Sequence, residues 1–116
     1  MNEKNKNMTN AYRQQLMFLS QQKQQLQLQI NILENTLKEL EATKETKVYK
    51  GIGNVFILSE KEDVIKQTKE NQETVSLRLK TVEKQEADIL KKLNDLLKED
   101  KSTSSKPEEK NPEGIA

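Results

Sequence analysis

Residues 47–59 read KVYKGIGNVFILS, and this stretch decides how the rest of the chain is expected to fold. Val48-Tyr49 and residues 55–58 are β-branched, aromatic or aliphatic, which favours strands. Residues 51–54 (GIGN) lie between them and tolerate the positive φ angles of a tight turn. The stretch therefore predicts a β-hairpin over residues 47–58.

The second predicted strand, VFIL, is apolar on both faces, because successive side chains of a strand point to opposite sides. A two-stranded hairpin is not stable alone. We therefore expect other chains to cover it, in an obligate oligomer whose hairpins join edge to edge. The alternative is a hairpin folded onto its own helix ends, which would cover one face only. The predicted oligomer interface comprises Val48, Tyr49, Gly51, Ile52, Gly53, Asn54, Val55, Phe56, Ile57 and Leu58.

Two long segments without Gly or Pro flank the hairpin, residues 10–46 and residues 60–100. In each, one set of positions alternates in steps of four and three, which predicts a narrow helical stripe that packs on another helix. The first stripe is Tyr12, Leu16, Leu19, Lys23, Leu26, Ile30, Leu33, Leu37 and Leu40. The second stripe is Ile65, Thr68, Gln72, Val75, Leu79, Val82, Glu86, Ile89, Leu93 and Leu96.

The predicted fold is mainly α: a long antiparallel two-helix coiled coil with a β-hairpin between the helices. A hairpin connection brings Leu16 opposite Leu90 and places Lys23 near Glu86, two polar stripe residues of opposite charge. Ser59 and Glu62 have the spacing of a capping box, with Ser59 as the N-cap of the second helix.

Composition limits the chain to one domain, since 116 residues with 32% hydrophobic and 34% charged residues cannot build a broad core. We expect a flexible N-terminus over residues 1–9 and the folded domain over residues 10–100. Residues 101–116 carry both prolines and no apolar pattern, which predicts a disordered tail.

The residue inventory argues against an enzyme and against a bound cofactor or metal ion. The chain contains no His and no Cys, which excludes thiol catalysis, Ser–His triads and thiolate zinc sites. A net charge of +1 provides no basic field for nucleic acid or an anionic membrane. The longest apolar run, residues 55–58, is far too short to span a bilayer. A cytosolic or nuclear protein is the default expectation.

The helix, the VYKGIGNVFIL hairpin and a second helix with LRLKTVEKQEADILKKLNDLL together resemble a β-type prefoldin subunit over roughly residues 10–98. The run GNVFIL followed by SEKE is most similar to the first subunit of the eukaryotic complex, and residues 79–86 are similar to the archaeal β subunit. One hairpin rather than two favours the β type over the α type.

The resemblance implies a cytoplasmic hexamer of α- and β-type subunits whose hairpins join into a platform of β-barrels. Coiled coils extend from that platform, and their tips hold non-native client proteins without ATP. The family passes clients, mainly actin and tubulin in eukaryotes, to a group II chaperonin. It therefore implies other prefoldin subunits, unfolded proteins and the chaperonin as partners.

The expected client contacts lie where the first helix begins and the second ends. Met17 and Phe18 fall outside the heptad stripe, so packing between the helices does not account for them. Such an apolar surplus can hold unfolded chains weakly, and Met adapts to irregular surfaces. The alternative is that the stripe residues among them only close the end of the coiled coil. The predicted contacts are Met8, Tyr12, Leu16, Met17, Phe18, Leu93, Leu96 and Leu97.

Two other functions are compatible with a coiled-coil hairpin. A scaffold or tether protein without chaperone activity needs only the heptads and could lose residues 55–58 without consequence. A nucleic-acid factor would need a basic stripe, and the chain has two arginines and a nearly neutral charge.

Overall fold

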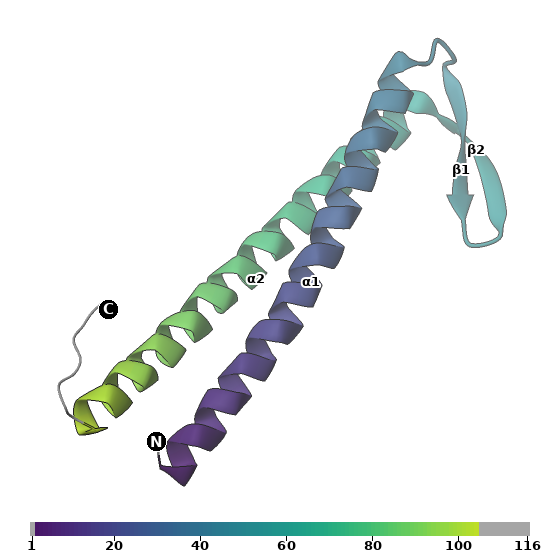
Figure 1. Ribbon diagram of the computed structural model, residues 1–116. Coiled ribbons are helices and arrows are strands. Elements are labelled where there is room, and N and C mark those ends of the chain that lie inside the picture. The colour runs from purple at the N-terminus through teal and green to yellow at the C-terminus, as the bar shows by residue number, and fades with distance from the viewer. Residues whose placement is uncertain (1, 105–116) are drawn as a thin grey trace. The chain divides into compact units, whose positions relative to one another are not determined.

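The computed structural model describes residues 2–104, with side chains for residues 2–99. Its elements are α1 (Glu3–Ala42), β1 (Lys47–Ile52), β2 (Val55–Glu60) and α2 (Lys61–Ser104), as Figure 1 shows. The predicted helix–hairpin–helix order and the mainly helical class are confirmed. Residues 101–104 continue α2, and the rest of the predicted tail lies outside the described residues.

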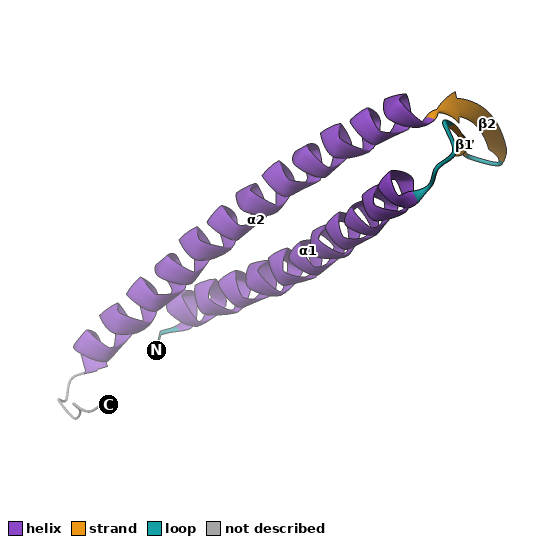
Figure 2. Cartoon of the chain, turned by 90° about the horizontal axis from the view of Figure 1, so that it is seen from above, coloured by secondary structure: helices purple, strands orange, loops and turns teal. Residues whose placement is uncertain are grey.

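The chain divides into two compact units. The terminal unit contains the described residues up to Gln22 together with those from Val82 on, and the hairpin unit is Lys23–Thr81. In the terminal unit the start of α1 lies beside the end of α2, and the two helices run in opposite directions (Figure 1). The hairpin unit holds the end of α1, the two antiparallel strands and the start of α2 (Figure 2).

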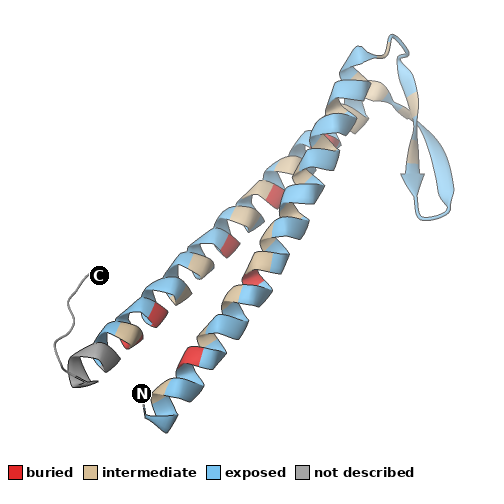
Figure 3. Cartoon of the chain, viewed as in Figure 1, coloured by how far each residue is buried: buried red, intermediate tan, exposed pale blue. Residues whose placement is uncertain are grey.

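Both predicted heptad stripes lie on the inner side of their helices. Every position of the two stripes is buried or half-buried, and the exposed residues of each helix fall between successive stripe positions in the sequence (Figure 3). The most buried apolar members are Leu19, Val75, Val82, Leu93 and Leu96. No described side chain is less than 2% exposed. Each unit is therefore held together by the seam, meaning the facing residues of the two heptad stripes, and not by a broad core.

Within the described part, no helix combines the length and apolarity that crossing a bilayer requires.

α1 begins at Glu3 and thus includes most of the segment expected to be a flexible N-terminus. Asn2 is the N-cap: its side-chain Oδ1 accepts a hydrogen bond of 2.7 Å from the Asn5 amide, which satisfies one of the donors that a helix start leaves unpaired. The seam also begins earlier than the stripe predicted, because Thr9 is only 3% exposed. Thr9 precedes Tyr12 by three positions and so continues the same heptad spacing.

α1 ends at Ala42 instead of residue 46. The Thr43 hydroxyl accepts a hydrogen bond of 3.3 Å from the Glu45 amide, a local turn that competes with a further helical turn. The Lys61 ammonium and amide then reach back to this connection. They donate to the carbonyl oxygens of Thr43 at 3.1 Å and Thr46 at 2.9 Å, respectively.

The predicted capping box at the start of α2 is wrong. Ser59 is a strand residue paired with Val48, and its hydroxyl donates to the Ile57 carbonyl at 3.2 Å. The helix begins at Lys61 because the strand ladder continues through the Lys47–Glu60 pair. Ser59 and Glu62 have the sequence spacing of a capping box, but Ser59 pairs within the strand ladder and therefore does not cap α2.

Candidate functional site

The hairpin presents an apolar face to solvent. Tyr49 pairs with Leu58 and Gly51 pairs with Phe56, so these four residues lie on one face of the sheet. Tyr49 and Phe56 are 74% and 75% exposed, and Leu58 is also exposed. Figure 3 shows the strands in pale blue along most of their length. Within the described residues nothing covers this face, which supports the prediction that another chain does so.

The turn of the hairpin depends on Gly53. Ile52 pairs with Val55, which leaves Gly53 and Asn54 as the two connecting residues. Gly53 has a φ of 59°, in the left-handed region that Gly adopts without the steric cost other residues bear. A Cβ there would meet nothing within 4 Å, so the requirement for Gly is conformational.

The opposite face of the hairpin lies toward the start of α2. The Lys50 ammonium donates a hydrogen bond to the Gln67 side-chain oxygen, and a cleft of about 390 Å³ runs between the sheet and the helix. Ile57 lines this cleft together with Val64 of α2. Ile52 and Ile57 nevertheless remain 53% and 46% exposed. The alternative of a hairpin folded onto its own helix therefore applies to one face, and only in part.

An ion pair closes the base of the hairpin. The Lys47 ammonium lies 2.7 Å from the Glu60 carboxylate, and the two residues are also strand partners. The hydrogen bond from Lys47 to Glu60 and the opposite charge of that carboxylate raise the pKa of Lys47 above its ordinary value. Both side chains are more than half exposed, so solvent screens the attraction.

The terminal unit separates the predicted client contacts into two groups. Leu93 and Leu96 are buried in the seam, and Tyr12, Leu16 and Leu97 are half-buried. The packing role of all of these except Leu97 is one that their heptad spacing already predicts, whereas Leu97 lies one position beyond the stripe. Met8, Met17 and Phe18 are 37%, 64% and 60% exposed. Met17 and Phe18, both outside the stripe, therefore provide most of the exposed apolar surface of this unit on α1, and Met8 adds a smaller part.

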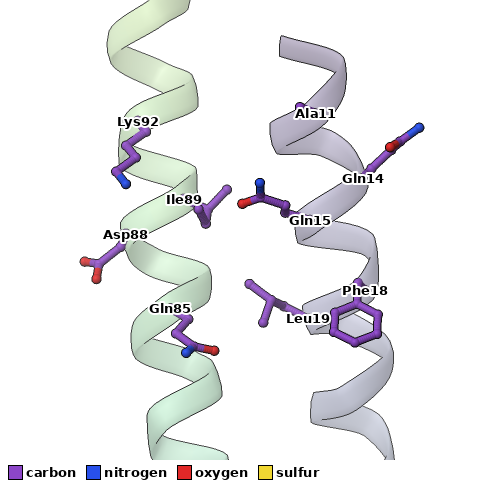
Figure 4. Close-up of a pocket in the computed structure, with 9 residues that line it drawn as sticks. All are labelled: Ala11, Gln14, Gln15, Phe18, Leu19, Gln85, Asp88, Ile89 and Lys92. Atoms are coloured by element: carbon purple, nitrogen blue, oxygen red, sulfur yellow. The ribbon is translucent and has the colours of Figure 1, made fainter. Parts of the chain in front are cut away.

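Met17 and Phe18 line two different grooves. The Phe18 groove, of about 630 Å³, is lined by side chains that include Gln15, Phe18, Leu19, Gln85, Ile89 and Lys92 (Figure 4). The Met17 groove, of about 550 Å³, is lined by side chains that include Arg13, Leu16, Met17, Glu83, Ala87 and Leu90. Neighbouring residues on a helix point about 100° apart. Met17 and Phe18 therefore belong to opposite flanks of the seam.

Sequence reasoning did not single out several residues that the structure brings forward. Gln15 and Gln85 line the Phe18 groove, and only the facing of the two helices reveals that they share it. Leu28, Ile32 and Leu77 of the hairpin unit are more than half exposed, although each is a large apolar side chain. Their positions outside the heptad stripes are the sequence feature that could have identified them as exposed. Among the described side chains, no three carboxylates gather where a metal ion could bind.

Comparison with known proteins agrees with this architecture. The family described as "Prefoldin subunit" matches residues 3–103. The prefoldin β subunit of Thermococcus onnurineus is 39% identical over 90 residues, which cover 77% of this chain and 74% of that subunit. The prefoldin β subunit of Archaeoglobus fulgidus is 38% identical over 92 residues, covering 72% of this chain and 79% of the relative.

A solved structure is similar along nearly the whole chain. The crystal structure of the prefoldin β subunit from Thermococcus strain KS-1 superposes with a TM-score of 0.83 at 30% sequence identity. The alignment covers 92% of this chain and 97% of that one. The predicted resemblance to a β-type subunit is thereby confirmed, whereas the finer likeness to the eukaryotic subunit stays a prediction.

Proposed function

This chain belongs to the prefoldin family as a β-type subunit, and we propose that it works in a cytoplasmic hexamer that holds non-native proteins without ATP. Prefoldin subunits are chaperone components and not enzymes. We further propose that the complex captures actin- or tubulin-like clients at its coiled-coil tips and delivers them to a group II chaperonin. Its other components would be α- and β-type prefoldin subunits.

The exposed hairpin supports the assembly part of the proposal. Tyr49, Phe56 and Leu58 form an apolar face that water contacts in the isolated chain. Burying apolar surface contributes about 25 cal/mol per Å², so association with similar hairpins is favourable. The lysines of β1 interrupt its apolar character, whereas residues 55–58 of β2 carry no charge. An uncharged edge strand is the one that pairs most readily with another chain.

The single observation that carries the client-holding part is the exposure of Met17 and Phe18 beside a seam that is already closed. Leu19 and Leu93 are buried, so helix packing in this unit does not require either exposed side chain. A large apolar side chain that solvent contacts is available to an apolar segment of another protein. Met17 also shares its groove with Leu90, which is 47% exposed, and neighbouring exposed apolar side chains commonly mark protein-interaction surfaces.

The experiment that tests this function uses the complex purified with the full chain. Chemically unfolded actin is diluted into buffer with the complex, and its aggregation is followed by light scattering. The Met17→Ser, Phe18→Ser variant should assemble normally but suppress aggregation less. The matched control is Leu28→Ser, Ile32→Ser, which removes two comparably exposed apolar side chains from the same helix outside the terminal unit.

The control should suppress aggregation as well as the unmodified complex does. If the unmodified complex gave no suppression, the holdase function would be excluded and the scaffold interpretation would take its place. Full suppression by the Met17→Ser, Phe18→Ser variant would exclude these two residues as client contacts.

A further inference from the structure

The two grooves of the terminal unit differ in the chemistry of their polar lining. The Phe18 groove carries the amides of Gln15 and Gln85 beside the apolar side chains of Phe18, Leu19 and Ile89. Its charged lining residues, Asp88 and Lys92, are of opposite sign. The Met17 groove has no glutamine, and its lining instead includes Arg13, Glu83 and Glu86. The first groove is therefore neutral and amide-lined, and the second is bordered by charges.

The Phe18 groove presents its amide and apolar groups together. Figure 4 shows Gln15 of α1 and Ile89 of α2 extending toward one another in the space between the helices, with Leu19 directed into the same space. Asp88 points away from that space in the same view. A side-chain amide carries both a donor and an acceptor, which are the two groups that an unpaired peptide bond needs.

These features identify the ligand by its chemistry. An extended segment of an unfolded protein has free backbone N–H and C=O groups, whereas a helix or a folded sheet has already paired them. A charged side chain entering this groove would lose hydration without gaining a net opposite charge. Complementarity of charge thus favours an uncharged segment with an aromatic or aliphatic side chain. The volume of the groove lies within the range of about 300–1,000 Å³ that is typical of ligand sites.

We propose that the Phe18 groove is a subsite for an extended, uncharged apolar segment of the client, held through its backbone by Gln15 and Gln85. The Met17 groove, on the other flank of the seam, binds a separate segment of the client. This inference rests on the proposed holdase function and specifies the class of segment that one side of the helix pair takes. Two independent grooves also allow one helix pair to hold two segments of the same client.

The test uses the complex that contains the full chain and a fluorescent peptide with blocked ends. The probe alternates Val and Thr around one central Phe over about ten residues, which extends it to roughly 30 Å. Binding is measured by fluorescence anisotropy. Phe18→Ser should weaken binding about tenfold, because it removes the apolar wall of the groove. Leu28→Ser is the matched control, because it removes a comparably exposed apolar side chain of α1 outside the terminal unit, and it should change the affinity less than about twofold.

Two further measurements address the amides and the charge. A probe N-methylated at alternate residues stays extended but loses N–H donors, and it should bind at least about fivefold more weakly. The Gln15→Glu, Gln85→Glu variant keeps the side-chain shapes but removes their N–H donors, and it should weaken the unmodified probe at least as much. Binding of the neutral probe should not change with ionic strength.

The outcomes separate this inference from the function on which it rests. Equal losses from Phe18→Ser and Leu28→Ser, undiminished binding of the N-methylated probe, or tighter binding of a helical competitor would each overturn the inference. If the complex still suppressed actin aggregation, the holdase function would stand. Absence of both peptide binding and aggregation suppression would overturn the two together.

Discussion

Gly51 and Phe56 face each other across the hairpin, and the Phe56 ring covers the position where a side chain at Gly51 would lie. A Cβ on Gly51 would be 3.3 Å from Cε1 of that ring. The two residues are strand partners, and Phe56 is 75% exposed. One face of the Phe56 ring therefore shields the backbone at Gly51, and the rest of the ring remains open to a partner chain.

This arrangement predicts different costs for alanine at the two hairpin glycines. Gly51→Ala needs only a small shift of an exposed ring, so the hairpin should change in stability by less than about 1 kcal/mol. Gly53→Ala places a Cβ at a φ of 59° and should destabilise the hairpin by about 1–2 kcal/mol. Hydrogen exchange of the strand amides measures both effects. Equal costs at the two positions would contradict this explanation.

The apolar face of the hairpin should be required for assembly but not for helix formation. Phe56→Ser, Leu58→Ser removes two large exposed side chains from that face, so the variant should be helical by circular dichroism yet fail to enter the complex. Leu77→Ser is the matched control, since it removes an exposed leucine from α2 in the same unit. Normal assembly of the double variant would exclude this face as the interface.

Lys23 and Glu86 are half-buried polar positions of the two heptad stripes. They belong to different units, and their mutual pairing remains a prediction from the heptads. Leucine at both positions should leave the fold intact or stabilise it by about 1–4 kcal/mol, because replacing partly buried charges with apolar packing removes a desolvation cost. Thermal unfolding of the Lys23→Leu, Glu86→Leu variant measures the change. Loss of helicity would instead show that these charges are needed for folding.

The Asn2 cap should determine how well the first turns of α1 are ordered. Asn2→Ala removes the acceptor for the Asn5 amide and should cost about 1 kcal/mol of local helix stability. Faster hydrogen exchange in the first turns would record the loss. Asn7→Ala, at an exposed position within the same helix, is the control and should not increase exchange. If both variants behaved alike, the cap would not be what starts the helix.

The Lys47–Glu60 ion pair should stabilise the folded chain only while Lys47 is protonated. Because the pKa of Lys47 is raised in the folded chain, its contribution is fully present below the ordinary lysine pKa of about 10.4. It is lost as the pH rises through the higher folded value. An NMR titration should give Lys47 a lower pKa in the Glu60→Gln variant than in the unmodified chain. An unchanged pKa would contradict the assignment of Glu60 as its cause.

The heptad stripes and the hairpin could be predicted because each depends on local chemistry. Leu19 and Val82 occupy stripe positions that any facing helix would bury. Gly53 and Asn54 lie in the predicted turn, and this fixes the strand register. The element ends were less predictable. At Thr43 and Ser59, hydroxyl hydrogen bonds and strand pairing compete with helix formation, and sequence spacing does not show which prevails.

The sequence alone also does not predict that the candidate site is divided into two grooves. Met17 and Phe18 were predictable as off-stripe apolar residues, but their separate grooves depend on which α2 residues face them. Ile89 and Gln85 border one groove and Leu90 borders the other. That partition follows from the packing of the two helices within the terminal unit.

Native mass spectrometry of the complex purified with the tagged chain from its own cells tests the central claim most directly. The proposal predicts a hexamer of small subunits in which the other members are also prefoldin-type helix–hairpin–helix chains. A homodimer, or a complex with unrelated proteins, would contradict the proposed assembly and point to a coiled-coil scaffold.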